Sequence, residues 1–199
     1  MQDADRIGSV SFALFDTALG RCALVWRGGS VIGFALPGTS DVDTSAHLKR
    51  RHADASPAEP PPTIATAIVG VQRLLAGEPA DLSNVPVDLA GVPPFEQRIY
   101  ALLREVGPGA TITYGELAER AGSPGAARAV GAAMGRNPVP VIIPCHRVLA
   151  GGGRSGGFSA PGGVSTKFRL LQIERADRGG GAMLFDDLPL AVAPSSPRT

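Results

Sequence analysis

One cysteine in this sequence stands beside a potential base and a fixed cation. Residues 138–148 read Pro-Val-Pro-Val-Ile-Ile-Pro-Cys-His-Arg-Val, so Cys145, His146 and Arg147 follow an apolar, proline-bounded run. The thiolate is the reactive form of cysteine, and positive neighbours favour it by lowering the thiol pKa. The stretch predicts a nucleophile at Cys145, held at the end of a stiff hydrophobic strand. The alternative is a buried cysteine that only packs, which is the commoner use of such a thiol.

The N-terminal half is predicted to hold a small set of strands and one helix. Alternating apolar residues predict strands over 10–14, 22–26 and 31–36, and the spacer 27–30 suits a hairpin turn. Cys22 falls in the second strand and is expected in the core. Residues 37–62 are polar and proline-rich, which predicts a loop or mobile insertion with His47 and His52 on a solvated face. Apolar spacing predicts a helix over 64–75, and the proline-containing linker 78–93 marks a domain boundary.

The C-terminal half is predicted to be mainly helical. One helix runs over 95–106, and Thr113 with Glu116 has the spacing of a capping box for a second helix over 114–121. Ser123 and Pro124 predict the start of a third helix over 124–135. These two short helices with a tight turn between them describe a helix-turn-helix. A last helix presents Val164, Phe168 and Leu171 on one face and carries Glu174 at its end, and a frayed tail follows residue 176.

The second helix of this pair has unusually small side chains. Arg128 stands among alanines and Gly131, so the helix offers one long side chain where sequence-reading helices usually offer several. This pattern favours close, sequence-tolerant contact with DNA, with Arg128 inserted into the minor groove. A helix packed tightly on a neighbour, with Arg128 in a surface ion pair, explains the same residues and remains open.

Charge and composition narrow the class of protein. The 199 residues carry a net charge of +1, but residues 95–178 hold 11 Lys/Arg against 6 Asp/Glu. That excess fits a phosphate-bearing partner or an ordinary solvated surface. Two cysteines cannot form a zinc site of the CxxC kind, and both are expected to be reduced. No apolar stretch is long enough to span a bilayer, and no secretory signal is visible, so a cytoplasmic protein without membrane contact is expected.

The motifs together resemble the O(6)-alkylguanine-DNA alkyltransferases, also called methylated-DNA–protein-cysteine methyltransferases. The resemblance is carried by Pro144-Cys145-His146-Arg147-Val148, by 113–118 and 128–134 in the helix-turn-helix, by Asn137-Pro138, and by 157–163 and 170–174. It is strong over about 92–176 and weak over 1–91. It implies an α+β protein with a small ribonuclease-H-like α/β domain over 1–91. A mainly helical, winged-helix-like domain over 92–176 and a tail over 177–199 would follow.

The resemblance also implies a reaction and its catalytic residues. Cys145 would take the alkyl group of O6-alkylguanine, or of O4-alkylthymine, irreversibly and once per molecule. Neighbouring side chains on an extended segment point apart, so His146 would draw the thiol proton through a water while Glu174 orients its ring. Asn137 would tie the recognition helix to the active-site strand. No cofactor and no metal are implied.

Further residues take binding roles by the same resemblance. Those implied to contact the flipped base are Tyr114, Val148, Ser159 and Phe158. Those implied to contact DNA are Arg128, Ala127, Ala129, Thr113 and Gly131. Arg128 would fill the gap left by the extruded nucleotide, because the lesion is out of a thiol's reach inside the duplex. The partner would be double-stranded DNA carrying alkylated bases, bound by a monomer, with cooperative binding left open.

Two departures from the family pattern concern the pocket wall. The segment 158–163 is two residues longer than a common sequence of this loop in the family, and Phe158 stands where tyrosine is frequent. Both departures leave open which sizes of alkyl group the pocket accepts. Two other function classes remain: a lesion sensor that transfers nothing, which Cys145 argues against, and an unrelated Cys–His–acid hydrolase, which gives no reason for a helix-turn-helix.

Overall fold

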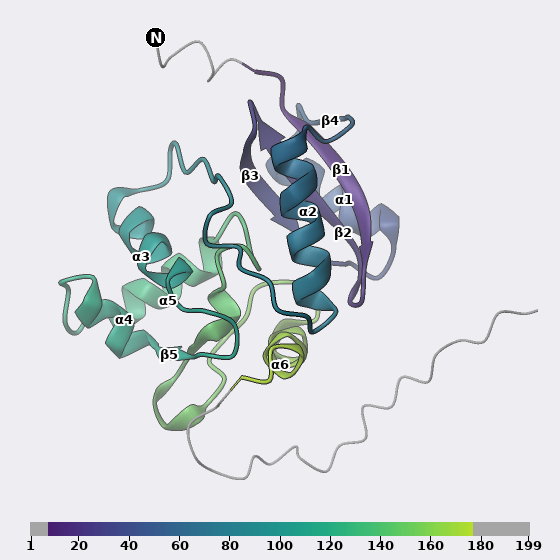
Figure 1. The fold of residues 1–199 in the computed structure, drawn as a ribbon. Coiled ribbons are helices and arrows are strands. Elements are labelled where there is room, and N and C mark those ends of the chain that lie inside the picture. The colour runs from purple at the N-terminus through teal and green to yellow at the C-terminus, as the bar shows by residue number, and fades with distance from the viewer. Residues whose placement is uncertain (1–7, 177–199) are drawn as a thin grey trace, which may run out of the picture.

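The computed structural model describes residues 8–176, in which a small sheet and a group of helices lie side by side (Figure 1). The mixed α+β class predicted from the sequence is confirmed. The strands are β1 Ser11–Thr17, β2 Gly20–Arg27, β3 Ser30–Ala35, β4 Ser56–Pro57, β5 Ile112–Thr113 and β6 Val148–Leu149. The α-helices are α1 Asp41–Arg51, α2 Pro62–Leu75, α3 Pro94–Arg104, α4 Tyr114–Arg120, α5 Ala127–Arg136 and α6 Gly163–Ile173.

The three predicted N-terminal strands form one sheet in the order β3-β2-β1-β4. Strand β2 pairs antiparallel with both neighbours, and the short β4 adds to β1 in parallel. Alternate β2 side chains point to opposite faces, so Cys22 and Leu24 join one core cluster while Ala23 and Val25 join another. Cys22 is fully buried, as expected. Because β2 is buried on both faces, other elements must pack against each face of the sheet.

The prediction of a loop or mobile insertion over 37–62 is wrong, because α1 lies within it and covers the second face of the sheet (Figure 1). Ser40 caps the helix by accepting a hydrogen bond from the Asp43 amide at 3.2 Å. The helix buries only Thr44 and Leu48. So narrow an apolar stripe shows little helical periodicity in the sequence, and the contact with the sheet stabilises the helix instead.

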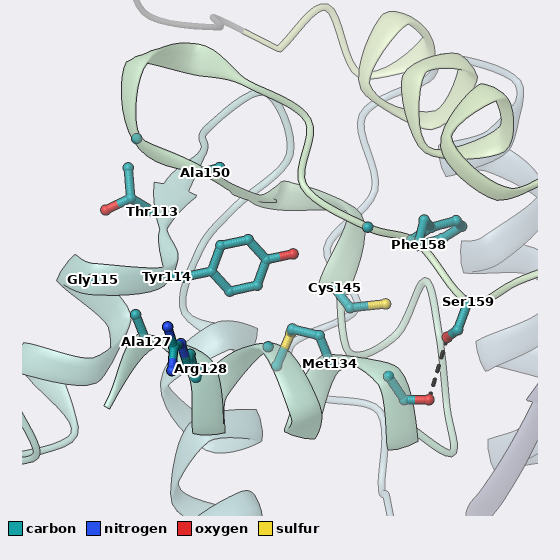
Figure 2. Close-up of a pocket in the computed structure, with 14 residues that line it drawn as sticks. Thr113, Tyr114, Gly115, Ala127, Arg128, Met134, Cys145, Ala150, Phe158 and Ser159 are labelled. Atoms are coloured by element: carbon teal, nitrogen blue, oxygen red, sulfur yellow. Dashed lines mark hydrogen bonds between the residues drawn. The ribbon is translucent and has the colours of Figure 1, made fainter. Parts of the chain in front are cut away.

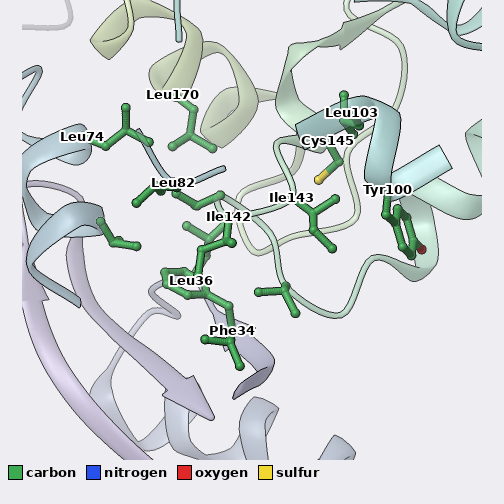
Figure 3. Close-up of a cluster of buried hydrophobic side chains, with 14 of the residues drawn as sticks. Phe34, Leu36, Leu74, Leu82, Tyr100, Leu103, Ile142, Ile143, Cys145 and Leu170 are labelled. Carbon is green, nitrogen blue, oxygen red and sulfur yellow. The ribbon is translucent and has the colours of Figure 1, made fainter. Parts of the chain in front are cut away.

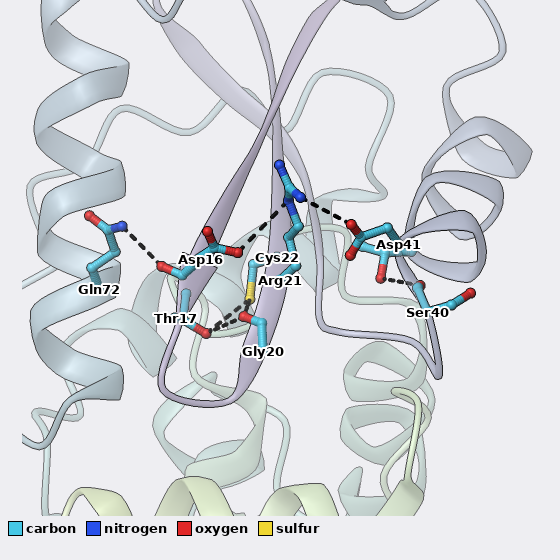
Figure 4. A network of polar contacts seen from close by, with 9 residues as sticks. Asp16, Thr17, Gly20, Arg21, Cys22, Ser40, Asp41 and Gln72 are labelled. Carbon is cyan, nitrogen blue, oxygen red and sulfur yellow. Dashed lines mark hydrogen bonds and ion pairs between the residues drawn. The ribbon is translucent and has the colours of Figure 1, made fainter. Parts of the chain in front are cut away.

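Polar contacts fix α1 against the hairpin formed by β1 and β2 (Figure 4). The Arg21 guanidinium lies 3.0 Å from Asp41 at the start of α1 and 3.8 Å from Asp16 on β1. On the other side of the hairpin, the Gln72 amide of α2 donates to the Asp16 carbonyl at 3.0 Å. The two helices are thereby attached to the same end of the sheet.

The linker 78–93 crosses between the two halves while pairing with β3. The Val31 amide donates to the Pro86 carbonyl at 2.8 Å, and the Asp88 amide donates back to the Val31 carbonyl at 2.9 Å. The predicted helices over 64–75 and 95–106 are present as α2 and α3. Buried residues from both halves form one cluster, which includes Phe34 and Leu36 from the N-terminal half and Ile142, Ile143 and Leu170 from the C-terminal half (Figure 3). The sheet and the helical half therefore share a core.

The predicted helix-turn-helix is formed by α4 and α5. Thr113 and Glu116 make both hydrogen bonds of the capping box, at 3.1 Å and 2.8 Å. The predicted start of the second helix at Ser123 and Pro124 is wrong, because α5 begins at Ala127 without a side-chain cap. Gly125 adopts a φ of 83°, which is not helical, so the turn continues through Gly125 and the helix starts after it.

The apolar run before Cys145 is a tight loop and not the predicted strand. Pro138, Pro140 and Pro144 lack amide donors, and Val141 has a φ of 75°, a conformation rare for a β-branched residue. The Ile143 amide closes the loop on the Val139 carbonyl at 2.8 Å. Cys145 then begins a single 3-10 turn, Cys145–Arg147. The last helix, α6, follows as predicted, although Val164 is exposed and does not face the core.

Within residues 8–176, no helix is both long and apolar enough to cross a membrane. The tail predicted after residue 176 lies outside the described residues.

Candidate active site

The loop that precedes Cys145 is held by a buried asparagine. Asn137 ends α5, and its amide nitrogen donates to the Ile143 carbonyl at 2.8 Å. Its carbonyl oxygen accepts from the Val139 amide at 3.0 Å. One side chain therefore links the end of the helix-turn-helix to both ends of the loop. This fixes where Cys145 stands relative to α5.

Behind the cysteine lies a buried ionic cluster of His146, Arg147 and Glu174. The His146 Nε2 atom lies 2.9 Å from Glu174 Oε1, and the Arg147 guanidinium donates to both oxygens of the same carboxylate at 2.9 Å and 2.7 Å. Arg147 also donates to the Val106 carbonyl. Burial alone would raise the pKa of Glu174, but the hydrogen bonds from His146 and Arg147 outweigh it and lower that pKa to about 2. The carboxylate is therefore charged.

The charged carboxylate selects the tautomer of the imidazole. Burial lowers the pKa of His146 below its ordinary value, so the ring is neutral near pH 7 despite the opposing effect of Glu174. A neutral ring beside an acceptor places its proton on Nε2. Nδ1 then carries a lone pair, and it is buried with no hydrogen-bond partner in the described part of the chain. His146 is therefore available as a base on the side away from Glu174.

Lys167 of α6 is a second cation near the thiol, and it is completely buried. Its ammonium donates to the Val148 carbonyl at 2.6 Å and to the Ser155 carbonyl, and it lies 5.9 Å from the Tyr114 ring centroid. Burial lowers the pKa of Lys167 to about 8, although Cys145 acts in the opposite direction. Burial raises the pKa of Cys145, while Asn137 and the charge of Lys167 oppose that shift. The resting thiol is therefore protonated.

These electrostatics correct one expectation from the sequence. Arg147 was expected to be the cation that favours the thiolate, but its guanidinium is committed to Glu174 and Val106. Lys167 takes that place and was not identified from the sequence. A signal was present, because Lys167 follows Val164 by three residues and precedes Leu171 by four. A lysine at that spacing stands on the apolar stripe of a helix.

In front of Cys145 opens a cavity of about 780 Å³ between the helix-turn-helix and the loop 150–159 (Figure 2). Tyr114 begins α4 and points its hydroxyl into this space, toward the side where Cys145 lies. Burial, followed by the effect of Cys145, raises the pKa of Tyr114, so its hydroxyl remains a donor. A Cβ at Gly156 would stand 2.9 Å from the Tyr114 ring, so glycine allows the loop to close on it.

Most of the residues predicted for binding meet at this cavity. Those that line it are Cys145, Tyr114, Ser159, Phe158, Arg128, Ala127, Thr113 and Gly131. Arg128 is exposed and has no ion pair or hydrogen bond within residues 8–176, so the alternative of a surface ion pair is wrong. Ala129 is exposed but does not line the cavity. Val148, Asn137, His146 and Glu174 lie behind the wall, and Met134 and Gly135 join it without having been predicted.

Two more details bear on substrate contacts. The Ser159 hydroxyl donates to the Gly135 carbonyl at 3.3 Å, which ties the loop to the end of α5. The Val148 carbonyl accepts from Lys167 at 2.6 Å, and Val148 itself is fully buried. Among residues 8–176, no group of three or more His, Cys, Asp or Glu side chains is placed to hold a metal ion.

Comparison with known proteins agrees with the family resemblance of the sequence motifs. The family model for the DNA-binding domain of 6-O-methylguanine DNA methyltransferase matches residues 94–176. The methylated-DNA–protein-cysteine methyltransferase of Mycobacterium tuberculosis is 39% identical over 126 residues, which are 63% of this chain and 74% of that protein. The chain belongs to the methylated-DNA–protein-cysteine methyltransferase family. The resemblance stated from the sequence is confirmed.

Other members of the methyltransferase family agree. The Haemophilus influenzae protein of the same name is 45% identical over 104 residues, covering 52% of this chain and 56% of that protein. A crystal structure described as Mycobacterium tuberculosis OGT in complex with DNA matches with a TM-score of 0.67 at 32% identity, covering 83% of this chain and 92% of that one. The methyltransferase of Pyrococcus kodakaraensis matches with a TM-score of 0.64 at 27% identity, covering 83% and 98%. As a member of this family, the chain is a DNA-repair methyltransferase with a DNA-binding domain.

Proposed function

We propose that this methyltransferase repairs double-stranded DNA by moving the alkyl group of O6-alkylguanine to the Sγ atom of Cys145. The observation that carries the proposal is the arrangement of His146. Its Nε2 is bonded to a charged Glu174, while its Nδ1 is a buried, unbonded acceptor one residue from a protonated thiol at a cavity wall. That arrangement provides a place for the thiol proton, which a transfer from carbon to sulfur requires.

The substrate base must leave the duplex before it can reach this thiol. The O6 atom lies inside the base stack, so extrusion of the nucleotide costs a few kcal/mol, and less for a poorly paired base. The small residues of α5 allow a close approach to the minor groove, and Arg128 extends from this helix without a protein partner. Arg128 would occupy the position of the extruded nucleotide.

The extruded purine would occupy the cavity in front of Cys145. Tyr114 would donate its hydroxyl proton to the base, and Ser159 would donate near O6. The backbone carbonyls of Cys145 and Val148 would accept from the exocyclic amine. Donors of this kind stabilise the negative charge that develops on the leaving guanine. A thymine alkylated at O4 presents a similar ether oxygen, so it is a second candidate substrate.

The chemical step then needs the side chains of this site and one water. His146 takes the thiol proton through that water, the Sγ electron pair attacks the alkyl carbon, and the bond from that carbon to O6 breaks. The electron pair of the broken bond goes to guanine, and the proton released by the thiol is passed on to guanine. The product is a thioether, and none of the side chains around Cys145 can readily cleave it. The protein therefore acts once per molecule, and the step as written uses no cofactor.

Mass spectrometry of the intact protein tests this proposal. Incubation with a duplex containing O6-methylguanine should add one methyl mass, and peptide mapping should locate it on Cys145. Cys22 is a matched control, because burial raises its thiol pKa to about 11 and it faces the core of the sheet. Cys22→Ala should still be methylated, whereas Cys145→Ser should bind the duplex without gaining mass. Repeated turnover, or a methyl group on any other residue, would overturn the proposal.

A hydrolase of the Cys–His–acid type is the second candidate, since the structure does contain those three residue types around one site. In that case the thiol would turn over many substrate molecules. The same experiment separates the two functions, because a hydrolase leaves no stable adduct on Cys145.

A further inference from the structure

A second, smaller cavity of about 120 Å³ also has Cys145 in its wall. Phe158 and Ser159 line both this cavity and the larger one, so the two spaces share the wall around the thiol. In Figure 2 the Cys145 sulfur points toward the side on which Phe158 and Ser159 lie. The reacting sulfur therefore stands between the space assigned to the base and this second space.

Part of the wall of the smaller cavity comes from α1, the helix that the sequence did not predict. His47 and the exposed Arg51 of α1 line it together with Cys145 and the segment 158–161. No aspartate or glutamate is among the lining residues. Arg51 has no carboxylate partner within residues 8–176; its guanidinium makes one long contact of 3.4 Å to the Asn137 carbonyl. Burial, followed by the charges of Arg50 and Arg51, lowers the pKa of His47, so Arg51 supplies the positive charge.

The geometry of the transfer requires space beside the sulfur, which this cavity provides. Attack by sulfur proceeds in line with the breaking bond, so any group beyond the transferred carbon must project to the side of that line. A methyl group has only hydrogens there, whereas a longer substituent needs space beside the sulfur. A volume of about 120 Å³ is roughly four times the share of one water molecule in the liquid. That volume holds a group of a few heavy atoms, such as a carboxylate.

We propose that the smaller cavity binds the part of the O6 substituent beyond the transferred carbon, and that Arg51 makes it selective for substituents ending in a carboxylate. O6-carboxymethylguanine is the simplest such lesion. This inference rests on the proposed function and names a substrate class for it. In the reaction a bond forms between Sγ and the methylene carbon, the bond from that carbon to O6 breaks with its electron pair going to guanine, and the thiol proton is passed on to guanine. The product is S-carboxymethylcysteine.

The experiment compares three duplexes of one sequence, which carry O6-carboxymethylguanine, its neutral amide O6-carbamoylmethylguanine, or O6-methylguanine. The rate of adduct formation on Cys145 is measured by intact mass for each duplex. The carboxylate and the amide have nearly the same size but differ in intrinsic reactivity toward a thiolate, so the carboxylate-to-amide rate ratio of the native protein is divided by the same ratio for Arg51→Gln. We expect this quotient to be about ten in favour of the carboxylate, equivalent to about 1.4 kcal/mol.

Three variants of α1 identify the source of that ratio. Arg51→Gln should lower the carboxylate-to-amide rate ratio by about tenfold, and Arg51→Glu should lower it further. Lys49→Gln removes a cation from the same helix but from a residue that does not line this cavity, so it should keep the native ratio. A ratio that Arg51→Gln leaves unchanged overturns the inference. Methyl transfer separates the two proposals: if O6-methylguanine gives an adduct while Arg51→Gln leaves the ratio unchanged, only the subsite fails, whereas no adduct from any duplex removes the proposed function as well.

Discussion

The Nε2 atom of His146 lies 2.9 Å from Oε1 of Glu174, and both side chains are buried behind the cysteine that precedes the histidine in the sequence. Because the carboxylate fixes the proton on Nε2, the lone pair of Nδ1 is left for the thiol proton. Arg147 holds the same carboxylate from the other side and keeps it charged. In the proposed mechanism, the reactivity of Cys145 therefore depends on a residue 29 positions away in the chain.

Replacement of Glu174 by glutamine should slow methyl transfer by about a hundredfold or more, because the ring loses the charge that fixes its tautomer and supports its protonated form. The measurement is single-turnover methylation of Cys145 by an O6-methylguanine duplex. Glu59→Gln, at an exposed position outside this cluster, is the matched control and should keep the native rate.

Glu174→Gln also leaves Arg147 without its carboxylate, so the variant is expected to be less stable. The rate is therefore compared at a temperature where circular dichroism shows both proteins folded. A folded Glu174→Gln protein that reacts at the native rate would remove Glu174 from the mechanism.

Replacement of Arg128 by alanine should weaken repair of a paired lesion more than reaction with the free modified base. Arg128 is exposed on α5 at the cavity rim and has no partner within residues 8–176, so its removal changes the contact with DNA and not the fold. Extrusion costs a few kcal/mol, and loss of the residue that replaces the base should cost about tenfold or more in rate on the duplex. Arg98→Ala, exposed on α3, controls for the loss of one positive charge. Equal losses on the duplex and on the free base would exclude an intercalating role.

Replacement of Lys167 by methionine should raise the thiol pKa further and slow the reaction near pH 7. The charge of the buried ammonium opposes the rise of the Cys145 pKa, and the ammonium donates to the Val148 and Ser155 carbonyls. One pKa unit corresponds to a factor of ten in the thiolate population, so a loss of about tenfold is expected. The pH–rate profile distinguishes this effect from a packing defect, since it should move to higher pH. Lys49→Met, at an exposed position of α1, should leave the profile in place.

Acid should destabilise the native protein partly through Glu174. Its folded pKa of about 2 lies below the ordinary value of 4.5. The carboxylate therefore contributes stability above about pH 4.5, and this stability is lost as the pH falls toward 2. Denaturant unfolding of the native protein and of Glu174→Gln between pH 6 and pH 3 measures this contribution. The difference in unfolding free energy between the two proteins should shrink as the pH falls. A difference that stays constant with pH would show that folding does not lower the pKa of Glu174.

Local signals in the sequence predicted the elements whose stability is local. The capping box of Thr113 and Glu116 and the alternation along β2 were found because each is encoded within a few neighbouring residues. Helix α1 was missed because its stability comes from contacts with the sheet, made by Leu48 and by Asp41 with Arg21 of β2. The shifted start of α5 was missed because Gly125 takes a positive φ in the folded turn. The loop before Cys145 was predicted as a strand because a short apolar run is typical both of a buried strand and of a buried loop.

The sequence by itself determined the family and singled out the cysteine that we propose to react, because both are carried by contiguous motifs. Only the tertiary structure decided the charges and protonation states of the site. In the folded protein Arg147 is paired with Glu174, and Lys167 lies close enough to the thiol to affect its pKa. Nδ1 of His146 has no hydrogen-bond partner among the described residues, and Arg51 of α1 lines a cavity that includes Cys145. Burial and the distances between charges set pKa values and selectivity, and these arise when distant segments pack together.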